Sequence, residues 1–157
     1  MFEILLPIHD SHDLIAAREE GRRAARELGA TPLGETLAAT VVSELVRNVL
    51  EHAGGGEVRI TAEDRALSIV TLDCGPGIQD FPRALGRGYS TSGGAGLGLA
   101  AVAQVADCLE LTQRLPHGLR VRAIVPAGRL SSASGPHATD DRGSGQGCGR
   151  RSERRAA

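Results

Sequence analysis

The strongest pattern in the sequence is an apolar stripe at helical spacing over residues 36–53. Apolar residues that recur every three or four positions lie on one face of a helix. The run stops at three consecutive glycines, residues 54–56, and glycine commonly ends helices because it adopts the left-handed conformation of a C-terminal cap. This stretch therefore predicts an amphipathic helix with one buried face. The members of the stripe are Ala38, Val42, Leu45 and Val49.

Shorter patterns on both sides of this helix give a mixed order of strands and helices. Residues 2–8 are apolar enough for a first strand, and Asp10 or Ser11 offers an N-cap for a helix that ends near Gly29. After the long helix we expect two strands at 57–62 and 67–72, a glycine-rich stretch at 74–98, a helix at 97–107 and a hairpin of 109–115 with 119–125. This order predicts an α+β fold, a two-layer sandwich with helices on one face of a mainly antiparallel mixed sheet.

The end of the chain differs in composition from the rest. After Arg129 the residues are mostly Ser, Gly, Arg and Asp, with almost no apolar side chains. Such a segment cannot bury enough surface to offset the conformational entropy that it would lose on folding. We therefore predict one folded domain over residues 1–128 and a disordered tail over residues 129–157.

Charge and composition argue against several classes of partner. The net charge is −1, which gives no long-range field to gather nucleic acid or an anionic membrane. The first seven residues place Glu3 inside a very short apolar run, which suits neither a signal peptide nor a membrane span. The cysteines Cys74, Cys108 and Cys148 are far apart and form no C-x-x-C pair. We expect a cytoplasmic protein that binds neither nucleic acid nor a membrane.

Glu44 and Asn48 form the first cluster of chemical interest. They are four residues apart, so on a helix their side chains lie on the same face, at the edge of the apolar stripe. A carboxylate and an amide oxygen suit Mg²⁺, which accepts one or two protein ligands and takes the others from water and phosphate. When this pair is considered alone, it is better explained as two solvated polar residues beside a core stripe.

Asp73 forms the second cluster, at the end of an apolar strand and before Gly75-Pro76-Gly77. Glycine at these positions lets the backbone turn sharply and approach a ligand closely. A carboxylate at a strand end can accept a hydrogen bond from an exocyclic amine, such as that of adenine. A tight turn capped by Asp73 is an equally good explanation on local grounds.

The third cluster, residues 90–98, combines hydroxyl side chains with four glycines directly before a predicted helix. Unpaired backbone N–H groups at a helix N-terminus bind phosphate well. The stretch lacks the Gly-Lys-Ser/Thr of a Walker A loop and does not follow a strand as in a Rossmann unit. A flexible surface loop is the alternative, but it would not explain why the glycines adjoin a helix.

In their order along the chain, the three clusters resemble the N box, G1 box and G2 box of the GHKL superfamily of ATPases and kinases, whose Bergerat fold is a two-layer sandwich. The likeness is greatest to the anti-sigma-factor-type serine/threonine kinases, and among these to stressosome switch kinases. It covers roughly residues 3–126. The phrases that carry it are Ser43-Glu44-Leu45-Val46-Arg47-Asn48, Gly88-Tyr89-Ser90-Thr91-Ser92-Gly93-Gly94 and Gly96-Leu97-Gly98-Leu99.

The resemblance implies ATP and Mg²⁺ as cofactors and assigns a role to each motif residue. Glu44 would be the general base, Asn48 the magnesium ligand and Asp73 the partner of the adenine amino group. Gly75 and Gly77 would shape the adenine pocket. Family members often carry a Gln- or Glu-like residue where Cys74 stands, so we expect Cys74 only to pack as a small side chain. The phosphates would be covered by Ser90, Thr91, Gly94, Gly96 and Gly98.

By the same resemblance, the chain would be a serine/threonine protein kinase that phosphorylates a STAS-domain antagonist or scaffold protein in a bacterial partner-switching pathway. A PP2C-type phosphatase that it activates, or a sigma factor, would be a further partner. The alternative is an anti-sigma factor or nucleotide-switched module that acts by sequestration. A histidine-kinase catalytic fragment is a third possibility, which would need a separate dimerisation domain.

Overall fold

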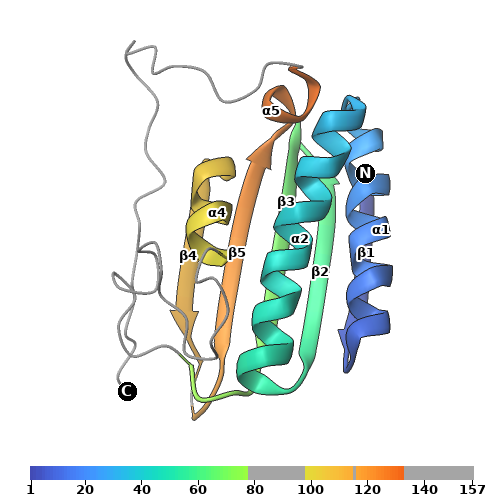
Figure 1. Cartoon of the computed structure of the whole chain (residues 1–157). Helices are drawn as coiled ribbons and strands as arrows, with labels where there is room; N and C mark the ends of the chain where they lie inside the picture. Colours follow the sequence, from blue (N-terminus) through green and yellow to red (C-terminus); the bar gives the residue numbers. More distant parts are fainter. Residues whose placement is uncertain (78–97, 115, 133–157) are drawn as a thin grey trace.

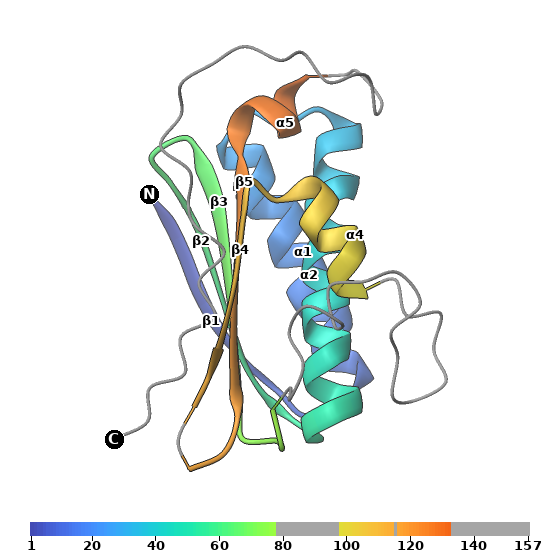
Figure 2. The same ribbon diagram turned by 90° about the vertical axis from the view of Figure 1, so that its left-hand side faces the viewer.

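The computed structural model describes residues 1–77, 98–114 and 116–132, and it shows two layers (Figure 1). A five-stranded sheet with the order β1-β2-β3-β5-β4 forms one layer. Helices α1, α2 and α4 cover one face of the sheet, as the edge-on view shows (Figure 2). The predicted α+β two-layer sandwich is confirmed. All four strand pairings of this sheet are antiparallel, so the parallel pairing that a mixed sheet implies is absent from the described strands.

The first three elements follow from local signals at their ends. They are β1 (Phe2–Ile8), α1 (Ser11–Glu27) and α2 (Pro32–Ala53). Helix α2 begins four residues earlier than predicted, because the Thr31 hydroxyl accepts a hydrogen bond from Gly34 N and Pro32 occupies the first turn. It ends where expected, at Gly54, which has the left-handed φ of 70°.

The other elements lie within two residues of their predicted bounds. They are β2 (Gly56–Glu63), β3 (Ala66–Asp73), α4 (Gly98–Val105), β4 (Cys108–Gln113) and β5 (Leu119–Pro126). Every second residue of β3 and β5 is buried, as expected for strands that have helices on one face only.

Helix α2 lies at the centre of the helical layer and supplies much of the core. The four residues of its predicted stripe are all at most 1% exposed. They pack in one cluster with aliphatic residues of α1 and of β2, β3 and β5, and most of the largest fully buried side chains are valine, leucine or isoleucine. Among the described residues, no helix is long and apolar enough to cross a membrane.

A short helix, α5 (Ala127–Ser131), corrects the predicted domain boundary. Leu130 is fully buried, and its carbonyl oxygen accepts a hydrogen bond from Thr31 N at 3.0 Å. A Cβ at Gly34 would lie 1.8 Å from that carbonyl oxygen, so only glycine permits this contact between α5 and α2. The boundary predicted at residue 128 therefore falls inside a packed helix. Residues 133–157 of the predicted tail lie outside the described part of the chain.

Shortening the chain after residue 128 should destabilise it, whereas shortening after residue 132 should not remove any described core contact. The first change deletes Leu130, and loss of a buried leucine side chain typically costs about 2–5 kcal/mol. Urea unfolding of both shortened chains measures the difference. Equal midpoints would show that α5 contributes nothing to the fold.

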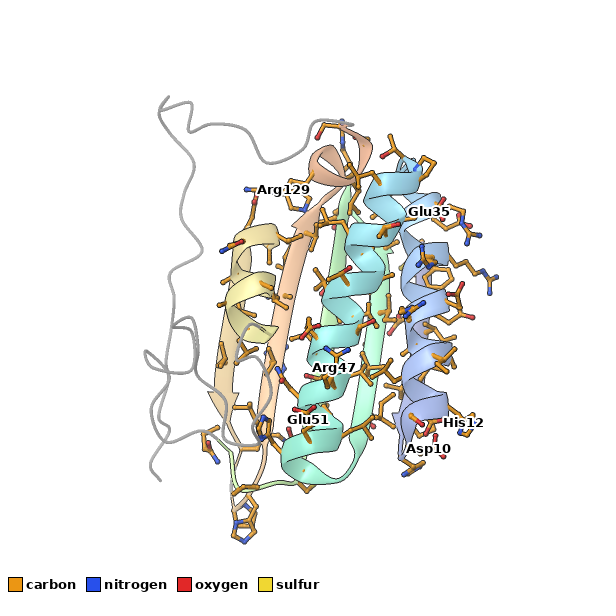
Figure 3. All side chains as sticks on the ribbon, in the orientation of Figure 1. Asp10, His12, Glu35, Arg47, Glu51 and Arg129 are labelled. Carbon is orange, nitrogen blue, oxygen red and sulfur yellow. The ribbon has the colours of Figure 1, made fainter. Side chains whose placement is uncertain are left out.

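The stability of the domain should also depend on the ionisation of Asp10, which caps α1 (Figure 3). Hydrogen bonds from the backbone N–H groups of Asp13 and His12 lower the pKa of the Asp10 carboxyl. Because that pKa is lower in the folded chain, the stabilisation is present above the unfolded-state pKa and is lost as the pH falls through the folded-state pKa. Asp10→Ser keeps a capping oxygen without the charge.

We therefore expect the free energy of unfolding of Asp10→Ser to fall less than that of the wild type when the pH drops below about 4. Thermal unfolding at several acidic pH values checks this. Identical pH profiles would mean that the Asp10 charge does not stabilise the helix start.

Candidate functional site

The start of α4 lies against α2 at the two polar residues singled out in the sequence. A Cβ placed at Gly98 would be 3.1 Å from Glu44 Oε2 and 3.5 Å from Asn48 Oδ1. The absence of a side chain at Gly98 thus lets α4 begin beside both groups. The structure brings together the predicted site residues Glu44, Asn48 and Gly98, although Gly98 comes 50 positions after Asn48 in the chain.

Glu44 is held on one side by a residue that the sequence analysis did not place in the site. The Arg47 guanidinium forms an ion pair with Glu44 Oε1, while Oε2 is the oxygen nearest Gly98. The Glu44 side chain is 22% exposed and that of Arg47 is 44% exposed. The three-residue spacing on a helix was the signal for this pair. Figure 3 shows Arg47 on α2, about one turn before Glu51.

Asp73, the last residue of β3, is buried and firmly positioned. Its Oδ1 accepts hydrogen bonds from Gly75 N at 2.9 Å and Leu119 N at 3.1 Å, and its backbone oxygen accepts one from the Arg114 guanidinium at 2.8 Å. Its Oδ2 accepts no hydrogen bond from the described residues. Two backbone donors therefore fix the orientation of the carboxylate. The predicted hydrogen bond between Asp73 and the adenine amino group stays a prediction.

Close packing favours glycine at residue 75, and the backbone conformation favours it at residue 77. A Cβ at Gly75 would lie 2.7 Å from Ala53 Cβ, at the end of α2. Gly77 has a φ of +76°, and a Cβ there would lie 2.1 Å from the Gln113 side chain. Gly75 therefore lets the segment after β3 lie close to the end of α2, and Gly77 supplies a left-handed turn. Their predicted role in shaping an adenine pocket stays a prediction.

Gly118 is a further residue that lies close to Asp73. Its φ is +115°, and a Cβ would lie 2.1 Å from the Asp73 backbone oxygen. The Pro116-His117-Gly118 turn was predicted only as a hairpin connection. Its contact with Asp73 comes from the pairing of β3 with β5, which the local sequence does not reveal.

The other predicted phosphate-binding residues, Ser90, Thr91, Gly94 and Gly96, lie outside the described residues, so their roles stay predictions. Cys74 is a free thiol and is exposed, so the packing role expected for it is wrong.

The described part of the chain contains no cluster of three or more His, Cys, Asp or Glu side chains that could hold a metal ion. A metal at Glu44 or Asn48 would therefore take most of its ligands from water and from a bound molecule. Mg²⁺ binds in this way to nucleotide phosphates, so the donor set fits that ion.

All these groups are arranged along α2. Glu44 and Asn48 are one turn apart, and Ala53, which contacts Gly75, lies about 7.5 Å further along the axis at 1.5 Å per residue. A Cβ at Gly56 would lie 2.9 Å from Val49 Cγ1 and 3.2 Å from Asp73 Cα, so Asp73 lies close to the part of α2 that follows Asn48. The placement of a nucleotide with its base at Asp73 and its phosphates near Asn48 stays a prediction.

Comparison with known proteins identifies the family and a relative of this chain. Residues 34–129 match the family described as histidine kinase-, DNA gyrase B-, and HSP90-like ATPases. The chain is also 39% identical, over 116 residues, to the serine/threonine-protein kinase RsbT of Bacillus subtilis (strain 168), a match that covers 71% of this chain and 87% of that protein. The two-layer α+β fold is consistent with that of GHKL ATPases. The chain belongs to the family of histidine kinase-, DNA gyrase B- and HSP90-like ATPases.

Proposed function

We propose that this protein is a serine/threonine protein kinase that uses ATP and Mg²⁺ to phosphorylate a STAS-domain protein of a bacterial partner-switching pathway, in the cytoplasm. The observation that carries the proposal is the convergence of Glu44 Oε2 and Asn48 Oδ1 at Gly98. The fixed Asp73 carboxylate, whose Oδ1 accepts hydrogen bonds from Gly75 N and Leu119 N, supports it. The 39% identity to a serine/threonine kinase supports the reaction type.

Each described side chain has one task in this reaction. Asp73 Oδ2 accepts a hydrogen bond from the adenine amino group, which orients the nucleotide along α2. Asn48 offers an amide oxygen to the metal ion, and Mg²⁺ would supply charge neutralisation at the phosphate oxygens. Glu44 Oε2 accepts the proton of the attacking serine or threonine hydroxyl as the new phosphorus–oxygen bond forms and the bond to the leaving diphosphate breaks.

The protein substrate is tested directly by transfer of labelled γ-phosphate to purified STAS-domain proteins from the same genome. Transfer to a serine or threonine of one of them supports the proposal. A chain that phosphorylates none of them but binds a sigma factor tightly would instead act by sequestration. Binding to a PP2C-type phosphatase is measured in the same series.

Asp73→Asn should weaken ATP binding about 5- to 150-fold without unfolding the protein. The amide oxygen can still accept the hydrogen bonds from Gly75 N and Leu119 N, but an NH₂ group then replaces Oδ2 and faces the adenine amine. A mispaired buried polar contact costs about 1–3 kcal/mol. Calorimetry with ATP checks the affinity, and thermal unfolding checks the fold. Unchanged affinity in a folded variant would remove Asp73 from the site.

Glu44→Gln should keep the affinity for Mg-ATP within a few fold but lose phosphate transfer. The glutamine side chain is nearly isosteric and cannot accept the hydroxyl proton, and loss of a general base typically lowers a rate by about 10²–10⁴. Asn48→Asp should act differently, because it adds a negative charge beside metal and phosphates and so weakens binding itself.

Calorimetry and single-turnover transfer to the STAS substrate separate these two effects. Wild-type transfer rates for Glu44→Gln would show that another residue is the base.

A further inference from the structure

The Arg47–Glu44 ion pair lies inside the proposed site, and none of the roles assigned so far uses Arg47. We propose that Arg47 is a positioning residue that orients the Glu44 carboxylate for proton transfer. It binds Oε1 and thereby presents Oε2 toward Gly98. This inference rests on the proposed function of Glu44 as the general base.

The geometry divides the two carboxylate oxygens between two tasks. Oε1 is engaged by the Arg47 guanidinium, three residues later on α2. Oε2 lies 3.1 Å from the position that a Cβ of Gly98 would take, at the first residue of α4. A carboxylate bound through one oxygen cannot rotate freely about its last torsion. The pair therefore selects which oxygen faces α4 and how that oxygen is directed.

The exposure of the two side chains suits this role. The Glu44 side chain is 22% exposed and that of Arg47 is 44% exposed, so the carboxylate is the more shielded partner of the ion pair. Without Arg47, a glutamate at this position would gain hydration by turning its carboxylate outward. The ion pair opposes that rotation and keeps the base at the boundary between α2 and α4.

Orientation of this kind matters because proton transfer needs a short contact. A general base must approach the hydroxyl oxygen to about 2.6–3.2 Å, and a misplacement of about 1 Å can slow a reaction about 10²-fold. Loss of Arg47 should therefore lower the rate of phosphate transfer and leave the nucleotide contacts at Asp73 and Asn48 in place.

The chain provides a matched control on α1. Arg22 Nε lies 3.3 Å from Glu19 Oε1, again with a spacing of three residues on a helix. Helix α1 lies on the opposite side of α2 from α4, so this pair is remote from the site (Figure 1). Arg22→Gln removes the same kind of interaction without affecting the proposed base.

The experiment measures Mg-ATP affinity by calorimetry and single-turnover transfer to the STAS substrate. It compares the wild type with Arg47→Gln, Arg47→Lys, Glu44→Gln, the Arg47→Gln/Glu44→Gln double variant and Arg22→Gln. We expect Arg47→Gln to slow transfer about 10- to 100-fold with ATP affinity within about twofold of wild type. Arg47→Lys should recover part of the rate, because a single ammonium can still bind Oε1, and Arg22→Gln should transfer at the wild-type rate.

The double variant gives the decisive comparison. If Arg47 acts through Glu44, removing it should cost nothing further once Glu44 is glutamine. Rate losses that multiply in the double variant would overturn the inference. A loss of ATP affinity large enough to account for the lower rate would also overturn it, because it would indicate that Arg47 contacts the phosphates directly. Faster transfer by Arg47→Gln would show instead that the ion pair restrains the base.

The same series separates failure of this inference from failure of the proposed function. If Glu44→Gln transfers phosphate slowly but Arg47→Gln transfers it at the wild-type rate, only the role of Arg47 is rejected. If Glu44→Gln transfers phosphate at the wild-type rate, the assignment of Glu44 as the base, on which that role rests, is rejected.

Discussion

The burial of one face of α2 is the constraint on which the rest of this structure depends. Its apolar stripe packs on the sheet and on α1, and this fixes both the axis of the helix and its rotation about that axis. Because Glu44 and Asn48 lie beside the stripe, the same packing determines where they point. Core stability and site geometry are therefore coupled, and a change in the stripe would displace the proposed base.

Glycine contacts connect the other elements to this helix. Gly98 admits the start of α4 beside Glu44 and Asn48, Gly75 brings the segment after β3 against Ala53, and Gly34 lets α5 pack against the start of α2. A Cβ would clash at Gly34 and Gly75 and would be tight at Gly98. These three glycines of the described chain therefore serve close approach between elements.

Electrostatic interactions in the site are local. The chain has a net charge of −1, and its arginines act through specific pairs: Arg114 at the Asp73 backbone oxygen and Arg47 at the Glu44 carboxylate. Arginine can hold a carboxylate in a defined direction because its donors are fixed in a plane. These pairs can orient the proposed base, whereas the low net charge gives little attraction of a charged partner over distance.

The sequence alone determined the order of the elements, the α+β sandwich and the grouping of Glu44 with Asn48, because these depend on periodicity and on spacing within one helix. It did not reveal that Leu130 is buried, since five residues of α5 carry too little periodicity to distinguish a docked turn from a tail. Nor did it reveal which oxygen of Asp73 is bound by backbone N–H groups or that Gly98 adjoins Glu44. Those facts depend on contacts between residues far apart in the chain, such as Asp73 with Leu119, and only the packing of the sheet and helices brings such residues together.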